Sequence, residues 1–289
     1  MRLTVDHGEV TGQADLGIFA VSVLAGLIGA LAGVGGGILI IPALTLLFGV
    51  DIHFAIGASI VSVIATSSGA AAAYVRDRLT NLRIGMFLEL ATTSGAVIGA
   101  LLAAVVASSL LYIVLGVVLV FSAAMQLTRL GEELAQNEPP SALARRLVLG
   151  DSYPDPRLGG EVAYSPRRIP LGFALMAVAG LVSGLLGIGS GALKVVAMDG
   201  AMGLPMKVSS ATSNFMIGVT AAASAGIYLG RGDVDVSIAS PVALGVLVGA
   251  FMGARLLGRL SNQHVRRIFV PVLAAIGIET ILRGVGFGL

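Results

Sequence analysis

The stretch Gly33-Val-Gly-Gly-Gly37 interrupts an uncharged, apolar run that extends from Leu16 to Val50. At ~1.5 Å per helical residue, one continuous helix of this length would overshoot a hydrocarbon core ~30 Å thick. Glycine is the residue at which such a helix breaks most easily. We therefore predict two short helices, at 16–32 and 38–50, that meet inside a membrane as a re-entrant hairpin.

A second break, Gly187-Ile-Gly-Ser-Gly191, lies 154 residues after the first. The same offset, without a gap, relates further residues of the two halves, among them Gly26 with Gly180, Ser59 with Ser213, Tyr74 with Tyr228, and Gly95 with Gly249. Chance matching of apolar residues does not keep glycines, hydroxyls and tyrosines in register over so long a stretch. We infer that the chain contains two repeats.

The predicted fold class is an all-α polytopic membrane protein with two inverted repeats, each a re-entrant broken-helix hairpin plus three transmembrane helices. The first repeat takes residues 1–128, a linker takes 129–168, and the second repeat takes 169–289. The expected helices are 16–32, 38–50, 54–75, 84–107 and 110–128 in the first repeat, and 170–186, 192–203, 208–229, 237–258 and 268–287 in the second.

The linker 129–168 is polar and contains five prolines among mixed charges. We favour a solvated cytoplasmic connector, and the alternative is a small docking or dimerising element around 147–164.

Charge in the loops predicts the orientation of the two halves. The loop at 76–83 carries three arginines against one aspartate, whereas its counterpart at 230–236 carries one arginine against two aspartates. Basic loops face the cytoplasm, so the two equivalent loops should lie on opposite sides of the membrane. We therefore expect inverted repeats in the cytoplasmic membrane, with both termini extracytoplasmic. The N-terminus, with only Arg2 before the first apolar run, indicates a mature start rather than a cleaved signal.

Composition excludes several classes of protein. Hydrophobic residues make up 56% of the chain and charged residues 12%, whereas a soluble domain usually has roughly a quarter charged. The chain has no cysteine and only three scattered histidines, so we expect no metal site and no cofactor. No basic block with interleaved aromatics is present, which argues against nucleic acid. The expected partners are the lipid bilayer and a small anion. The sequence does not decide whether the protein forms a homo-oligomer.

The two glycine breaks are the predicted substrate site, because each ends one short helix and begins another. Free N–H groups and the positive end of a helix dipole would then point into one central region and favour an anion. The alternative is that the glycines only permit close helix packing. The candidate residues are Gly33, Gly35, Gly36 and Gly37 in the first break, and Gly187, Gly189, Ser190 and Gly191 in the second.

Polar side chains next to the breaks extend this site. Lys194 is the only lysine in an apolar segment, and it either holds the anion or pairs with Asp199 or reaches the membrane interface. Ser59, its repeat mate Ser213, and Asn214 can donate neutral hydrogen bonds to an oxyanion, or can bond to backbone instead.

Glu89 is an intramembrane carboxylate without a basic neighbour in sequence. It is a candidate for proton coupling, and the alternative is a buried, hydrogen-bonded acid. No histidine, second intramembrane aspartate or metal constellation is available for an intramembrane enzyme, so we expect no catalytic residues.

The paired runs also carry a family resemblance. They are the run from Ala25-Gly26-Leu27 through the first break to Pro42, the run from Ala179-Gly180-Leu181 through the second break, and Ala211-Thr-Ser-Asn214 after it. Together they resemble the sulfite exporter TauE/SafE family of membrane permeases, over both halves but not the linker. Ser190 interrupts the glycine run that is typical of the family, in the second repeat. The resemblance implies transport of small sulfur-containing anions, such as sulfite or sulfonates, often outward.

We therefore predict an ion-coupled secondary transporter, an exporter of a small sulfur-containing anion that is held between the hairpin tips. The rival within transport is an anion channel, which would need a continuous pore. An intramembrane enzyme is the remote alternative.

Overall fold

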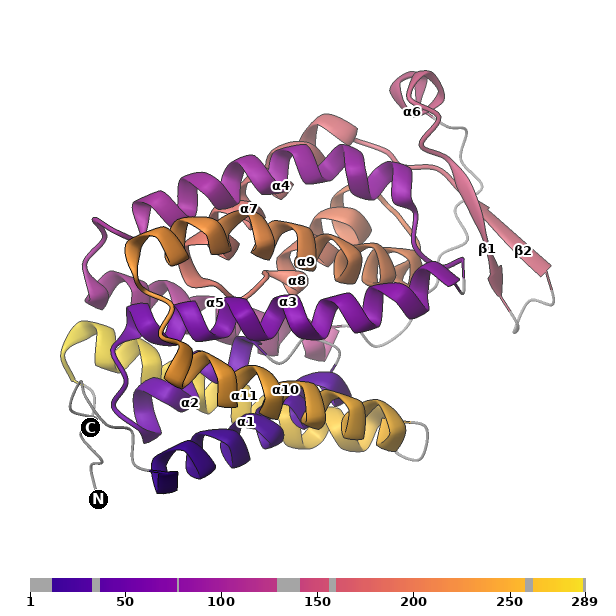
Figure 1. The fold of residues 1–289 in the computed structure, drawn as a ribbon. Coiled ribbons are helices and arrows are strands. Elements are labelled where there is room, and N and C mark those ends of the chain that lie inside the picture. The colour runs from indigo at the N-terminus through magenta and orange to yellow at the C-terminus, as the bar shows by residue number, and fades with distance from the viewer. Residues whose placement is uncertain are drawn as a thin grey trace.

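The computed structural model describes residues 12–32, 37–76, 78–128, 141–155, 160–257 and 262–287, and these residues are mostly helical (Figure 1). The first half contains α1 (Gly12–Ala32), α2 (Gly37–Leu47), α3 (Ile52–Arg76), α4 (Leu82–Leu102) and α5 (Ser108–Thr128). The second half contains α7 (Ile169–Leu186), α8 (Gly191–Val195), the π-helical turn η1 (Val196–Ala201), α9 (Met206–Arg231), α10 (Val236–Leu257) and α11 (Asn262–Val285). Between them lie α6 (Ala142–Arg146), β1 (Asp151–Asp155) and β2 (Gly160–Tyr164).

Each half begins with a helix that breaks and doubles back. The end of α2 returns to the start of α1, where a Cβ added at Gly17 would lie 3.3 Å from Cε1 of Phe48. The end of η1 returns to the start of α7 in the same way, and a Cβ at Gly172 would lie 2.4 Å from Met202. The second hairpin differs from the predicted single helix at 192–203, because its returning arm is a five-residue α-helix followed by π-helical backbone.

The packing of the two halves repeats under the 154-residue offset. Helix α1 packs on α10, and the equivalent helices α7 and α4 pack on each other. A Cβ at Gly249 would lie 2.0 Å from the carbonyl oxygen of Val23, and one at the equivalent Gly95 would lie 2.2 Å from that of Ala177. Glycine at these crossings permits the close backbone approach that helices in membranes use.

Equivalent helices of the two halves run antiparallel. The start of α3 lies at the end of α9, where a Cβ at Gly57 would lie 2.2 Å from the carbonyl oxygen of Asp233, and Gly218 of α9 lies against Ser67 further along α3. In α5 and α11, Gly116 likewise faces Gly277, while Gly284 near the end of α11 faces Ser109 at the start of α5. Inverted repeats would give antiparallel pairs of this kind, and the inversion of the whole second half stays a prediction.

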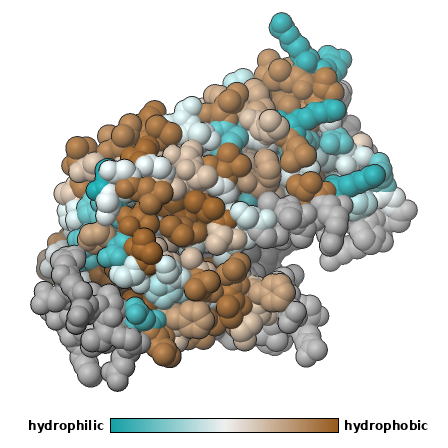
Figure 2. Space-filling view, viewed as in Figure 1, coloured by the Kyte–Doolittle hydropathy of each residue, from teal (hydrophilic) through white to brown (hydrophobic). Residues whose placement is uncertain are grey.

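The outer surface is apolar, as a bilayer requires. Three described helices are long and apolar enough to cross a membrane: Leu82–Leu102, Ser108–Met125 and Ile169–Leu186. Large apolar side chains such as Leu90 and Phe251 are exposed, and Figure 2 shows apolar surface over much of the helical body. Hydrophilic side chains gather at the end where α6 and the β-hairpin lie in Figure 1. The chain is therefore an all-α polytopic membrane protein.

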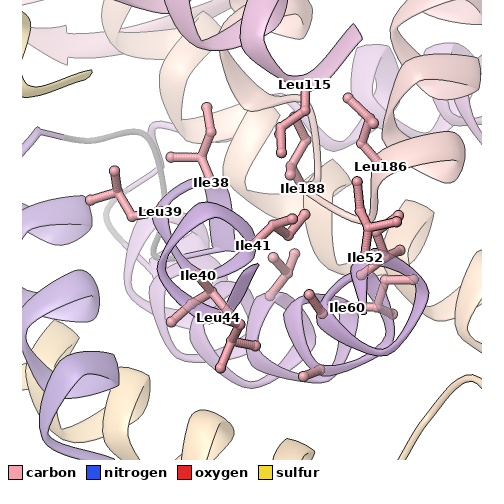
Figure 3. Packing of buried hydrophobic residues seen from close by; sticks show 14 of the residues in the cluster. Ile38, Leu39, Ile40, Ile41, Leu44, Ile52, Ile60, Leu115, Leu186 and Ile188 are labelled. Carbon is pink, nitrogen blue, oxygen red and sulfur yellow. The ribbon is translucent and has the colours of Figure 1, made fainter. Parts of the chain in front are cut away.

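The core is built around the first returning arm and the second break. Figure 3 shows Ile188 between Ile38 of α2 and Leu186 of α7, and Ile41 and Ile60 belong to the same buried cluster. These side chains are buried. The hydrophobic core therefore joins elements of both halves at the place where their helices break.

Part of the linker is docked, which corrects the favoured prediction of a solvated connector. Leu149 is 2% exposed and packs with Met198 and Met202 in one buried cluster. Asn81 Nδ2, at the start of α4, donates hydrogen bonds to the carbonyl oxygen of Leu149 (3.3 Å) and to Tyr164 Oη (3.0 Å). The strands β1 and β2 pair antiparallel and were not predicted, because each has only five residues of mixed polarity and gives little periodic signal.

Candidate functional site

The structure brings the described parts of the two breaks together at Ser59. Ser59 Oγ lies 3.0 Å from the carbonyl oxygen of Gly37 and 3.0 Å from that of Gly187, within hydrogen-bond distance of both. Its repeat mate Ser213 donates to the carbonyl oxygen of Gly191 at 3.2 Å. Gly33, Gly35 and Gly36 lie outside the described residues. The described residues of the two breaks thus face one region, held there by serines of α3 and α9.

The second break has left-handed backbone at three residues. The φ angles of Gly187 and Gly189 are 63° and 73°, and that of Ser190 is 43°. Left-handed backbone conformation is unfavourable for serine. The Ser190 hydroxyl offsets this cost by donating a 2.7 Å hydrogen bond to the carbonyl oxygen of Ala179 in the same hairpin. Ser190 therefore fixes the shape of the break.

The predicted polar donors are engaged with backbone carbonyls. Besides Ser59, Ser190 and Ser213, Asn214 Nδ2 donates to the carbonyl oxygen of Ser210 at 3.0 Å, one turn earlier in α9. Such bonds compensate buried polar groups and position the helices. These side chains therefore hold the two breaks in position.

Lys194 lies three residues after the second break and is 0% exposed. Its Nζ donates a hydrogen bond to Thr220 Oγ1 at 2.6 Å, and Thr220 Oγ1 lies 2.6 Å from Glu89 Oε1. Thr93 Oγ1 also donates to Glu89 Oε1 at 2.9 Å. A buried charge requires a charged or hydrogen-bonded partner, and Lys194 and Glu89 supply this for each other through Thr220.

The sequence singled out Lys194 and Glu89 separately but gave no signal that they meet. They belong to different halves, and Glu89 has no basic neighbour along its own helix. Their equivalents under the repeat are Ile40 and Ala243, both apolar. The hydrogen-bonded series Lys194–Thr220–Glu89 therefore has no charged counterpart at the equivalent positions of the repeat.

Two broken hairpins that meet between two repeats, with a buried charged group beside them, are the architecture of a membrane transporter. The chain belongs to the sulfite exporter TauE/SafE family, whose model matches residues 18–280. This membership agrees with the fold and with the resemblance carried by the two glycine runs.

Curated relatives are also named as membrane transporters. The chain is 27% identical over 275 residues to "Probable membrane transporter protein YunE" of Bacillus subtilis, covering 93% of this chain and 97% of that one. It is 28% identical over 239 residues to "Probable membrane transporter protein YdhB" of the same organism, covering 82% and 88%. No solved structure gives a significant match. The family and these relatives identify a transporter rather than an enzyme.

Proposed function

We propose that this protein is a secondary transporter that exports a small sulfur-containing anion, such as sulfite or an organosulfonate, from the cytoplasm. The observation that carries the proposal is the fully buried ammonium group of Lys194 beside the second break. A buried cation between two broken hairpins attracts an anion. The family's description as sulfite exporters supports a sulfur oxyanion as the substrate.

In this proposal the substrate lies between the two breaks, near the membrane midplane. Backbone N–H groups of the two breaks, among them those of Gly37, Gly189, Ser190 and Gly191, would donate to its oxygens. The N–H of Gly187 donates instead to the carbonyl oxygen of Ser183 at 2.7 Å. Lys194 supplies the opposite charge, while Ser59, Ser213 and Asn214 hold the two arms in place.

The orientation belongs to the same proposal. The basic loop between α3 and α4 lies beside the linker, because Asn81 binds Leu149 and Tyr164, and Arg83 donates to the carbonyl oxygen of Val148 at 3.4 Å. Basic segments that gather at one end favour a cytoplasmic location for that end. We propose the cytoplasmic membrane, inverted repeats and extracytoplasmic termini, with alternating access to the central site.

The test is transport by purified protein in proteoliposomes. Radiolabelled ethanesulfonate, thiosulfate and chloride are supplied in turn, and we expect saturable flux of the sulfur anions, driven uphill by an imposed ion gradient. Lys194→Met should abolish this flux, whereas Lys207→Met, outside the proposed site, should retain it. Steady, uncoupled flux of chloride would favour an anion channel. Absence of sulfur-anion flux would overturn the proposal.

A further inference from the structure

We propose that Lys194 exchanges one counter-ion for another during transport, and this inference rests on the proposed function. In the empty protein its partner is the ionised carboxylate of Glu89, reached through Thr220. When a substrate anion binds at Lys194, it replaces that carboxylate as counter-ion, and Glu89 takes up one proton from water. The pair, the anion and the proton then carry no net charge together.

The geometry allows this exchange without losing hydrogen bonds. Oε1 of Glu89 accepts from Thr220 and Thr93, whereas Oε2 is buried and, among the described residues, has no hydrogen-bond partner. A proton can therefore add at Oε2 while both bonds to Oε1 persist. The Thr220 hydroxyl also has the carbonyl oxygen of Met216 within hydrogen-bond distance, at 2.8 Å.

Burial makes the exchange obligatory. Lys194 is 0% and Glu89 8% exposed, so neither charge can be compensated by bulk water. An anion that joined an unchanged pair would leave one negative charge uncompensated inside the membrane, which is strongly unfavourable. Taking up a proton at Glu89 removes that charge.

The other titratable groups around Lys194 and Glu89 are engaged elsewhere, which leaves Glu89 as the group that takes up the proton when an anion binds. Helix α7, which packs on α4, carries no titratable side chain. On α9, Lys207 lies over the Tyr153 ring, Tyr228 Oη donates to the carbonyl oxygen of Gly184, and Arg231 donates to the carbonyl oxygen of Ala100 at the far end of α4. On α4 itself, Arg83 bonds to Val148 at the linker end. Two further groups lie on neighbouring elements, Tyr112 on α5 and Asp199 on η1, and the second enters the test below.

The consequence is coupling of one proton to each monovalent anion, moving in the same direction. No net charge crosses the membrane in a cycle, so flux of a monovalent sulfonate should follow the pH gradient and ignore the membrane potential. Binding should also weaken about tenfold per pH unit over the range in which the empty site is deprotonated and the occupied site is protonated.

The first measurement uses ethanesulfonate, whose single charge is fixed over the pH range of interest. Wild-type protein in weakly buffered detergent solution is titrated with it, and a pH indicator reports proton uptake. We expect about one proton per bound anion. Binding without proton uptake overturns the exchange and leaves the proposed function intact. Absence of binding, together with absence of sulfur-anion flux, overturns both.

The second measurement locates the proton. The infrared difference spectrum on adding ethanesulfonate should show the C=O band of a newly protonated carboxylic acid. Glu89→Gln should remove this band, whereas Glu279→Gln, which changes a half-buried carboxylate of α11, and Asp199→Asn should keep it. A band that survives Glu89→Gln, or disappears in Asp199→Asn alone, overturns the assignment. A measurement of proton uptake alone would not show which residue is protonated. In Glu89→Gln, where position 89 is neutral, Lys194 can release a proton and regain it when the anion binds.

A milder variant guards against misfolding of Glu89→Gln. Thr93→Val removes one hydrogen bond to the ionised carboxylate and leaves both charges in place. The ionised carboxylate of the empty protein then loses a hydrogen bond, so the pH above which ethanesulfonate binding weakens should move upward. Thr92→Val, which removes a hydroxyl bonded only to helix carbonyls among the described residues, is the matched control. An unchanged pH profile in Thr93→Val overturns the proposal.

Discussion

At the residue scale, glycines of the second break differ in the reason why a larger residue is disfavoured there. Gly189 has a φ of 73°, and a Cβ there would lie 2.7 Å from Ile217 Cγ2 and 3.1 Å from Val63 Cγ1. Gly191 begins α8, and a Cβ there would meet Ile217 Cδ1, the flexible end of a side chain, at 2.7 Å. Backbone conformation therefore restricts the first position, while side-chain packing restricts the second.

We predict that Gly189→Ala destabilises the protein by about 2 kcal/mol or more, because alanine is strained in left-handed backbone. Gly191→Ala should cost under about 1 kcal/mol, since Ile217 Cδ1 can move. Thermal unfolding in detergent measures both changes. Ile217→Val removes the Cδ1 atom, so combining it with Gly191→Ala should cost less than the sum of the two. Equal destabilisation by the two alanines would contradict this account of the break.

At the element scale, the β-hairpin of the linker is held to the helical body by a small polar contact over an apolar cluster. Asn81 also caps α4, since its Oδ1 accepts from the backbone N–H of Ile84 at 3.0 Å. Its backbone N–H in turn donates to Thr212 Oγ1 of α9 at 3.1 Å. One asparagine therefore connects the first half, the second half and the linker.

Burial raises the pKa of Tyr164 well above its usual range, and the hydrogen bond from Asn81 offsets this only in part. Because the folded pKa exceeds the unfolded value, the unfolded form loses its proton first as pH rises. Docking should thus be fully stable below about pH 10 and weaken above it. A spin label at Glu161→Cys should gain mobility at alkaline pH. Tyr164→Phe should weaken docking by roughly 0.5–1.5 kcal/mol at neutral pH and remove the alkaline loss; an unchanged profile would argue against docking through Tyr164.

At the scale of the whole molecule, symmetric helix crossings hold the two halves together. Gly26 of α1 faces Val246 of α10, and the equivalent Gly180 of α7 faces Thr92 of α4. At each crossing, backbone atoms of the partner helix occupy the space that a Cβ at the glycine would need. The close approach therefore depends on both helices of the pair.

The symmetry predicts matched effects. Gly95→Ala and Gly249→Ala should each destabilise the protein by about 2 kcal/mol or more, since the new methyl group meets a carbonyl oxygen. Gly226→Ala in α9, where a Cβ would meet nothing within 4 Å, should be neutral or slightly stabilising. Melting temperatures of the three variants provide the comparison. Full tolerance at either crossing would show that the helices can separate there without cost.

Topology gives a second prediction at this scale. The chain has no cysteine, so single cysteines report their own location. In intact cells, Arg78→Cys between α3 and α4 should be protected from an impermeant maleimide, and Gly230→Cys at the end of α9 should react. The reason is that α3 and α9 run antiparallel, which places the two exposed positions at opposite ends of the molecule. Equal labelling would remove the inverted-repeat hypothesis.

The sequence by itself determined most of the helices, because their positions depend on local properties. Apolar run length, glycine position and a constant offset located helices such as α3 and α9 to within a few residues of their observed ends. The linker hairpin was missed because its short, mixed strands have no such periodicity, and its burial depends on contact with Asn81 and the methionines of η1 and the following turn.

Only the tertiary structure decided what the polar residues do. Lys194 and Glu89 were identified singly by the cost of burying a charge, but their pairing through Thr220 exists only because α4 and α8 both pack on α9. Ser59 likewise bonds to two glycines that are far apart along the chain and adjacent in the fold. A hydrogen bond requires atoms to meet within about 3 Å, and helix periodicity does not specify which helices meet.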